Sequence, residues 1–137
     1  MRLVVDANIL FSALIKEGKI SELLINPALN LYTPEFILAE FDKYRIYLAN
    51  KSKRTEIEFD NIFIKLKQII TLIPLDKIKE QISLAKKICP DSDDIMYFAV
   101  AIKLNCPIWS NDKKLKEQDK IKIYSTDEIL KLVRRQV

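Results

Sequence analysis

Four acidic residues stand where their carboxylates could hold a metal ion. Asp6 ends the apolar segment "RLVV", Glu40 lies inside a helical pattern, and Asp112 follows "PIWS". Asp94 directly precedes the eight apolar residues 95–102, in the stretch "PDSDDIMYFAVA". Carboxylates gathered in one place repel each other, so they need a cation or large pKa shifts. An all-oxygen ligand set favours Mg²⁺ or Mn²⁺, which supplies an activated water for phosphodiester hydrolysis.

Three of these acids also have a structural interpretation. Asp6 could cap a helix that starts near Asn8, and Asp112 could cap a short helix "KKLKEQ". Glu40 could lie at the boundary of a helix and reach water. Its neighbours three and four residues away are mostly apolar or aromatic, however, which places the carboxylate on or beside the inward face.

Three aspartates crowd the entrance to the apolar segment 95–102. The helix dipole favours acids at a helix start, but one N-cap does not require three of them. We therefore assign Asp91 as the N-cap, Asp93 to solvent and Asp94 to the site. Asp91 and Asp93 remain competitors of Asp94 for the same position.

Short apolar runs alternate with helical patterns along the whole chain. The runs predict strands at 2–5, 30–33, 69–73, 107–110 and 121–125. The helical patterns begin at Thr33 (with Pro34 in the first turn), at a Thr55–Glu58 capping box, at Asp76, at Asp91 and at a Ser125–Glu128 capping box. This alternation predicts an α/β fold, a single three-layer α/β/α domain over 1–137 with a mostly parallel five-stranded sheet. If the first and fourth strands are neighbours where the strand order reverses, all four acids converge there.

Composition excludes several kinds of site. The 137-residue chain has no histidine, which removes Ser-His and Cys-His nucleophile pairs and imidazole zinc sites. Gly18 is the only glycine, which excludes a glycine-rich phosphate loop. Cys89 and Cys106 flank the predicted helix 91–104, roughly 20 Å apart, so we expect buried free thiols. No signal peptide or membrane span is recognisable, and we expect a soluble cytoplasmic protein.

The charge balance favours a polyanionic partner. The net charge is +4, and setting the four candidate acids aside leaves 15 acidic against 23 basic residues, a scaffold at +8. Basic surface around an acidic, metal-holding site suits cleavage of nucleic acid, with phosphate contacts supplying affinity. The candidate RNA-binding residues are Lys113, Lys114 and Lys116, in "NDKKLK".

Four segments, in order, resemble the motifs of the PIN-domain family, as found in VapC-type toxins. "VVDANIL" (4–10) is similar to the opening strand with its first Asp, and Asn8 takes the small polar position. "ILAEF" (37–41) is similar to the segment with the family's Glu, and "DDIMYFAVA" (93–101) to the third block. "IWSND" (108–112) is similar to the fourth block, with Ser110 two residues before the acid.

The resemblance implies a Mg²⁺- or Mn²⁺-dependent endoribonuclease in which Asp6, Glu40, Asp94 and Asp112 form the carboxylate quartet. It also implies a homodimer and, for a toxin, a small antitoxin protein as partner.

Three other classes of protein compete with this interpretation. A receiver domain needs a pair of acids near the first strand, but Asp6 has no acidic neighbour in the sequence. A haloacid-dehalogenase-like phosphatase needs Asp-x-Asp after the first strand, and Asn8 stands in place of the second Asp. A noncatalytic PIN-like module that only binds RNA or protein stays open.

Overall fold

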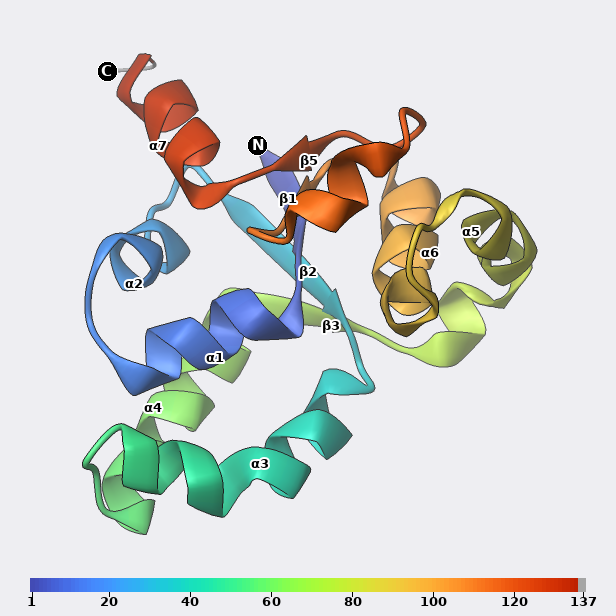
Figure 1. The fold of residues 1–137 in the computed structure, drawn as a ribbon. Coiled ribbons are helices and arrows are strands. Elements are labelled where there is room, and N and C mark those ends of the chain that lie inside the picture. The colour runs from blue at the N-terminus through green and yellow to red at the C-terminus, as the bar shows by residue number, and fades with distance from the viewer. Residues whose placement is uncertain (136–137) are drawn as a thin grey trace.

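A five-stranded, fully parallel β-sheet forms the centre of the computed structural model, which describes residues 1–135 (Figure 1). The strands are β1 (Arg2–Val5), β2 (Asn30–Pro34), β3 (Ile70–Ile73), β4 (Ile108–Trp109) and β5 (Ile123–Tyr124). Their order is β3-β2-β1-β4-β5, so β1 is the middle strand and pairs with both β2 and β4. This confirms the predicted α/β fold, and the pairing of β1 with β4 meets the condition under which the acids were expected to converge.

Helices cover both faces of the sheet and give three layers (Figure 1). The α-helices are α1 (Ala7–Ile15), α2 (Lys19–Leu24), α3 (Ile37–Lys51), α4 (Glu56–Ile69), α5 (Ile82–Ile88), α6 (Ile95–Leu104) and α7 (Thr126–Arg135). Short 3₁₀ helices are η1 (Leu75–Lys77), η2 (Lys79–Gln81), η3 (Ser92–Asp94) and η4 (Lys113–Glu117).

Side chains of the central strands alternate between two cores. Leu3 and Val5 pack with residues of α1, α2, α3, α4 and α7 on one face. Val4 and Ile108 pack with residues of α6 on the other face. Successive side chains of a strand point to opposite faces. Burial on both faces explains why "RLVV" and "PIWS" read as continuous apolar runs.

The helix start predicted at Thr33 is wrong. Thr33 and Pro34 belong to β2, which continues pairing with β3 as far as Pro34 and Ile73, and α3 begins only at Ile37. The buried Thr33 hydroxyl donates to the Val5 carbonyl oxygen (2.8 Å). Sheet pairing therefore overrides the local capping signal, and the Thr33 hydroxyl bridges β2 to β1 at the carboxyl ends of both strands.

The helix predicted from Asp76 is also wrong in its first half. The segment forms η1 and η2 before α5 begins at Ile82, and Asp76 lies inside η1. Ile78, between the two, leaves helical geometry (φ −124°, ψ 6°) and is fully buried. Burial of Ile78 accompanies the break. The predicted helix 91–104 is likewise divided into η3 and α6, and α2 was not predicted.

Other local predictions are confirmed. Thr55 and Glu58 form a reciprocal capping box at α4, and Ser125 and Glu128 exchange the same pair of hydrogen bonds at α7. Cys89 and Cys106 are free thiols, half-buried rather than fully buried. Within residues 1–135, no helix combines the length and apolar character needed to cross a membrane.

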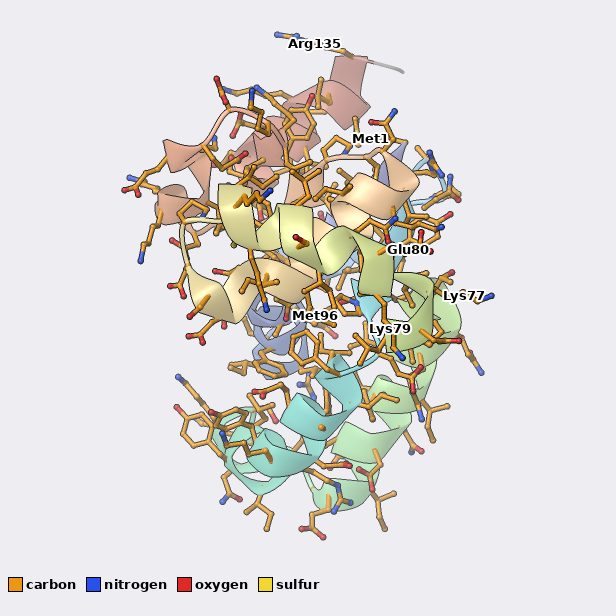
Figure 2. The ribbon with its side chains drawn as sticks, turned by 90° about the vertical axis from the view of Figure 1, so that its right-hand side faces the viewer. Met1, Lys77, Lys79, Glu80, Met96 and Arg135 are labelled. Carbon is orange, nitrogen blue, oxygen red and sulfur yellow. The ribbon has the colours of Figure 1, made fainter. Side chains whose placement is uncertain are left out.

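Helices α3 and α4 contact each other and form one end of the molecule (Figures 1 and 2). Figure 2 shows Met96, in the first turn of α6, on the side of that helix nearer to α3. The two helices carry six side chains that are exposed although apolar or aromatic, namely Tyr44, Ile46, Tyr47, Ile57, Ile64 and Ile69. One of these side chains, Tyr44, also lines the cavity described below.

Candidate active site

Three of the four predicted acids meet at a cavity of about 480 Å³ beside the carboxyl end of β1. Asp6, Glu40 and Asp94 line it, together with Asn8 and Asp93. They come from four elements, because Asp6 follows β1, Asn8 lies in α1, Glu40 in α3, and Asp93 and Asp94 in η3. This is the end of the sheet at which open α/β folds bind ligands.

A second cavity of similar size lies elsewhere and has different chemistry. It occupies about 520 Å³ between α5, α6 and the segment before β5, near the starts of β4 and β5. Its lining includes Ala101, Pro107 and Ile121, and it contains no acidic residue. The acidic cavity is therefore the better candidate for metal-dependent chemistry.

Asp6 is the most enclosed of the acids, with 5% of its surface exposed. Its Oδ1 accepts a hydrogen bond from the Ile9 backbone N–H (3.0 Å), so the residue also caps α1. Burial raises the pKa of Asp6, hydrogen bonds from Ser110 and the Ile9 backbone oppose that rise, and the nearby Asp112 charge adds to it. The structural interpretation of Asp6 and its role as a candidate ligand therefore coexist.

Asp94 faces the other acids. The pKa of Asp94 is raised to about 6, mainly by burial and then by the charges of Asp6, Asp91, Asp112 and Asp93. Although Asp94 stands at the N-cap position of α6, its side chain makes no capping hydrogen bond. Asp91 is the capping residue instead, since its Oδ1 accepts from the Asp93 backbone N–H (3.0 Å). Asp91 is therefore an N-cap as predicted, here of η3, and the role of Asp94 as a metal ligand stays a prediction.

Ser110 and Asp112 reach the site from the end of β4. The buried Ser110 hydroxyl accepts from the Asp112 backbone N–H (3.1 Å), and its interaction with the Asp6 carboxyl lowers the pKa of that group. Asp112 is exposed, and its Oδ1 accepts from the Lys114 backbone N–H (3.0 Å), so it caps η4 as its structural interpretation predicted. Its carboxylate does not line the cavity, although its charge raises the pKa of both Asp6 and Asp94.

The donor set fits a hard cation in chemistry. Asp6, Glu40 and Asp94 offer only oxygen ligands, and the mutual repulsion that raises the pKa of Asp94 is the kind that a divalent ion relieves. Within residues 1–135, no three acidic, cysteine or histidine side chains are close enough together to form a ready metal site. Binding an ion here would therefore require side-chain rotation, which the long side chain of Glu40 permits.

Five lining residues were not predicted as site residues, namely Ala7, Phe36, Lys43, Tyr44 and Tyr97. The Tyr97 hydroxyl accepts from the Ala7 backbone N–H (3.1 Å), and the ring packs edge-on against Phe36 (5.5 Å between centroids). Burial raises the pKa of Tyr97 above its usual value, so the phenol stays neutral. Lys43 is the one positively charged side chain among the residues that line the cavity. Tyr97 lay hidden in an apolar run, and Lys43 could have been found from its position three residues after Glu40.

Two of the three lysines predicted to bind RNA have ion-pair partners. Lys114 pairs with Asp91 (3.5 Å) and Lys116 with Glu128. None of the three predicted lysines lines the acidic cavity. Lys113 is exposed, and no ion pair of its side chain is found among residues 1–135.

The raised pKa of Asp94 predicts a pH dependence of metal-free stability. Because its pKa is about 6 in the folded chain against a usual 3.8, protonation favours folding. The stability that protonation of Asp94 adds to the folded state is complete below pH 3.8 and is lost as pH rises through 6. In EDTA, the stability of Asp94→Asn relative to wild type should therefore rise between pH 5 and 7.5, as measured by urea unfolding. A difference that stays flat over this range would contradict the assigned environment of Asp94.

Comparison with known proteins identifies a family and a shared fold. Residues 4–132 match the model of a family described as the PIN domain. No curated protein matches the chain significantly. Among solved structures, a chain in the crystal structure of VapBC2 from Rickettsia felis bound to a DNA fragment from their promoter is similar, with a TM-score of 0.65. The alignment covers 91% of this chain and 98% of the other at 17% sequence identity, a likeness of fold.

Proposed function

Because the chain belongs to the PIN domain family, we propose that it is a metal-dependent endoribonuclease that hydrolyses RNA phosphodiester bonds. The observation that carries the proposal is the meeting of Asp6, Glu40 and Asp94 on one cavity at the carboxyl end of β1, with Asp112 close enough to raise the pKa of two of them. Such mutual perturbation in a cleft is typical of functional sites.

We assign Asp6, Glu40, Asp94 and Asp112 to hold Mg²⁺ or Mn²⁺. The bound ion would supply charge stabilisation at a phosphoryl oxygen and a water of lowered pKa. Ser110 positions Asp6 and the Asp112 backbone, while Tyr97 anchors the start of α1 through Ala7. Asn8 is exposed at the cavity and is placed to hydrogen-bond a substrate oxygen. Asp91 supports the site as the cap of η3 and does not line the cavity, whereas Asp93 lines it as an exposed residue.

RNA is the proposed substrate class, and the toxin of a toxin–antitoxin pair is the proposed biological role. The family and the fold shared with a VapBC2 chain support this role, with a small antitoxin protein as partner. Of the lysines in 113–116, Lys113 is the most available for phosphate contact, whereas Lys114 and Lys116 would have to leave Asp91 and Glu128.

Cleavage of a structured RNA pool, mapped at nucleotide resolution with Mg²⁺ or Mn²⁺ and with EDTA, tests the proposal directly. We expect cuts at discrete positions that disappear with EDTA. The competing function is a noncatalytic RNA- or protein-binding module, which the absence of a ready metal site within residues 1–135 favours. RNA binding without cleavage under any metal condition would support that alternative.

We predict a homodimer, because α3 and α4 leave several large apolar side chains exposed. Ile46, Ile57 and Ile64 are 66, 75 and 49% exposed, whereas Phe41 and Leu48 of α3 belong to the protein's own core. Light scattering at tens of micromolar should give twice the 16.0 kDa chain mass. Ile57→Asp should shift this towards the single-chain mass, and a wild type that scatters as one chain would reject the dimer.

A further inference from the structure

We infer that one face of α3 is a stacking platform for single-stranded RNA, leading from the acidic cavity along Tyr44 and Tyr47. The inference rests on the proposed nuclease function and adds to it the strandedness of the substrate and the residues that read it. No base-specific contact is involved, since every base offers a face for stacking.

The platform follows from helical spacing. Glu40, Tyr44, Tyr47 and Lys51 lie four, three and four residues apart, so they share one narrow stripe of α3. Over these eleven residues the stripe extends roughly 16 Å. Glu40 and Tyr44 both line the acidic cavity, and Tyr47 comes one turn further along. A strand whose phosphate lies in the cavity can therefore continue directly onto the two rings.

Both rings are open to a ligand. Tyr44 is 38% and Tyr47 58% exposed. The Tyr44 ring is also supported from behind, because Phe11 packs edge-on against it with 6.0 Å between centroids. A partly exposed ring held by the core offers a stacking surface at low entropic cost.

Each ring carries its own lysine. Lys43 Nζ lies 5.3 Å from the Tyr44 centroid, and Lys51 Nζ lies 5.6 Å from the Tyr47 centroid. Lys51 also donates a hydrogen bond to the Tyr47 hydroxyl (3.3 Å). Neither lysine has a carboxylate ion-pair partner among residues 1–135, unlike Lys114 and Lys116. Two aromatic rings can stack on the bases of a single RNA strand, and two lysines without ion-pair partners among residues 1–135 can contact its phosphates.

This chemistry favours RNA over a protein partner on the same stripe. Protein interfaces are depleted of lysine at their centres, whereas here a lysine accompanies each ring. The exposed apolar residue Ile46 lies about 100° or more around the helix from the stripe, so the predicted dimer surface and the platform are separable. Duplex RNA keeps its bases stacked inside and cannot use exposed tyrosines in this way.

Binding is tested in the Asp94→Asn background with EDTA, so that cleavage does not interfere. Fluorescence anisotropy with a labelled 12-nucleotide oligoadenylate should show Tyr47→Ala binding roughly 5- to 150-fold more weakly than its parent. Ile46→Ala, on the same helix and similarly exposed, should bind like the parent. A 12-base-pair RNA duplex should show little difference between the parent and Tyr47→Ala.

Tyr47→Trp gives a direct readout, because the native Trp109 is fully buried. The new indole should be quenched by the oligoadenylate but not by an abasic oligomer with the same phosphates. Equal quenching by both, or unchanged affinity in Tyr47→Ala, would overturn the platform. Loss of affinity that appears only together with a change in molecular mass would assign Tyr47 to a protein interface and also overturn it. Metal-dependent cleavage by the wild type, measured separately, decides the proposed function whatever these results are.

Discussion

Asp94→Asn should abolish metal-dependent RNA cleavage while leaving the metal-free protein at least as stable as wild type. Activity should fall by more than roughly 100-fold, beyond the loss typical of residues that only orient metal ligands. Stability should not fall, because the Asp94 side chain makes no capping hydrogen bond and its charge is repelled by four neighbouring aspartates. Initial cleavage rates with Mn²⁺ and urea unfolding in EDTA give the two measurements.

The neighbouring aspartates provide matched controls for Asp94. Asp91→Ala removes the acceptor for the Asp93 backbone N–H and should cost about 1 kcal/mol of stability while cleavage persists. Asp93 is exposed at the rim, and Asp93→Asn should change both quantities little. Full cleavage by Asp94→Asn, combined with an inactive Asp91→Ala or Asp93→Asn, would show that another aspartate, not Asp94, is the metal ligand at this position.

Saturating Mn²⁺ should stabilise the folded protein, and its removal should eliminate cleavage. An ion that binds only the folded state adds about 2.7 kcal/mol to the free energy of unfolding at one hundred times its Kd. The effect should be larger at pH 7.5 than at pH 5.5, because Asp94 has a pKa of about 6 and must lose its proton to bind. Thermal unfolding with titrated Mn²⁺, at both pH values, measures it.

Asp6→Asn and Asp94→Asn should each reduce this stabilisation, whereas Asp93→Asn should retain it. Isothermal calorimetry provides an independent measurement of binding. A melting temperature indifferent to Mn²⁺ and Mg²⁺, together with no heat of binding, would refute the metal site. RNA binding by such a protein would then support the noncatalytic module.

The sheet could be predicted from the sequence because its strands are buried on both faces. Runs such as "RLVV" and "PIWS" leave few alternatives, and alternation with helical patterns predicts parallel pairing. Helix starts were predicted well where a side chain caps the next turn, as at Thr55 and Ser125. They failed at Thr33 and Asp76, where the pairing of β2 with β3 and the burial of Ile78 accompany a different local structure.

Three of the four acids predicted for the site, Asp6, Glu40 and Asp94, line one cavity, whereas Asp112 does not. Asp6 and Asp94 do face one cavity, since a strand end and a helix start are places that topology brings together. Tyr97 could not be assigned, because nothing in an apolar octet distinguishes a tyrosine that binds the Ala7 backbone from one that only fills the core. Lys114 and Lys116 pair with acids from segments that are distant in the sequence, and a count of charges along the sequence cannot predict such contacts.

The central place of β1 in the sheet has a consequence for the chain during synthesis. β1 pairs first with residues near 30, which emerge early, and on its other side with residues near 108, which emerge late. Closing the longer loop costs roughly 1 kcal/mol more in chain entropy. Until β4 is made, β1 has an open edge and Asp6 lacks its Ser110 neighbour. A ribosome that has made only the first hundred residues therefore carries a chain that contains every residue lining the acidic cavity but lacks Ser110 and Asp112, which act on Asp6, so translation itself delays the appearance of any activity that needs these two residues.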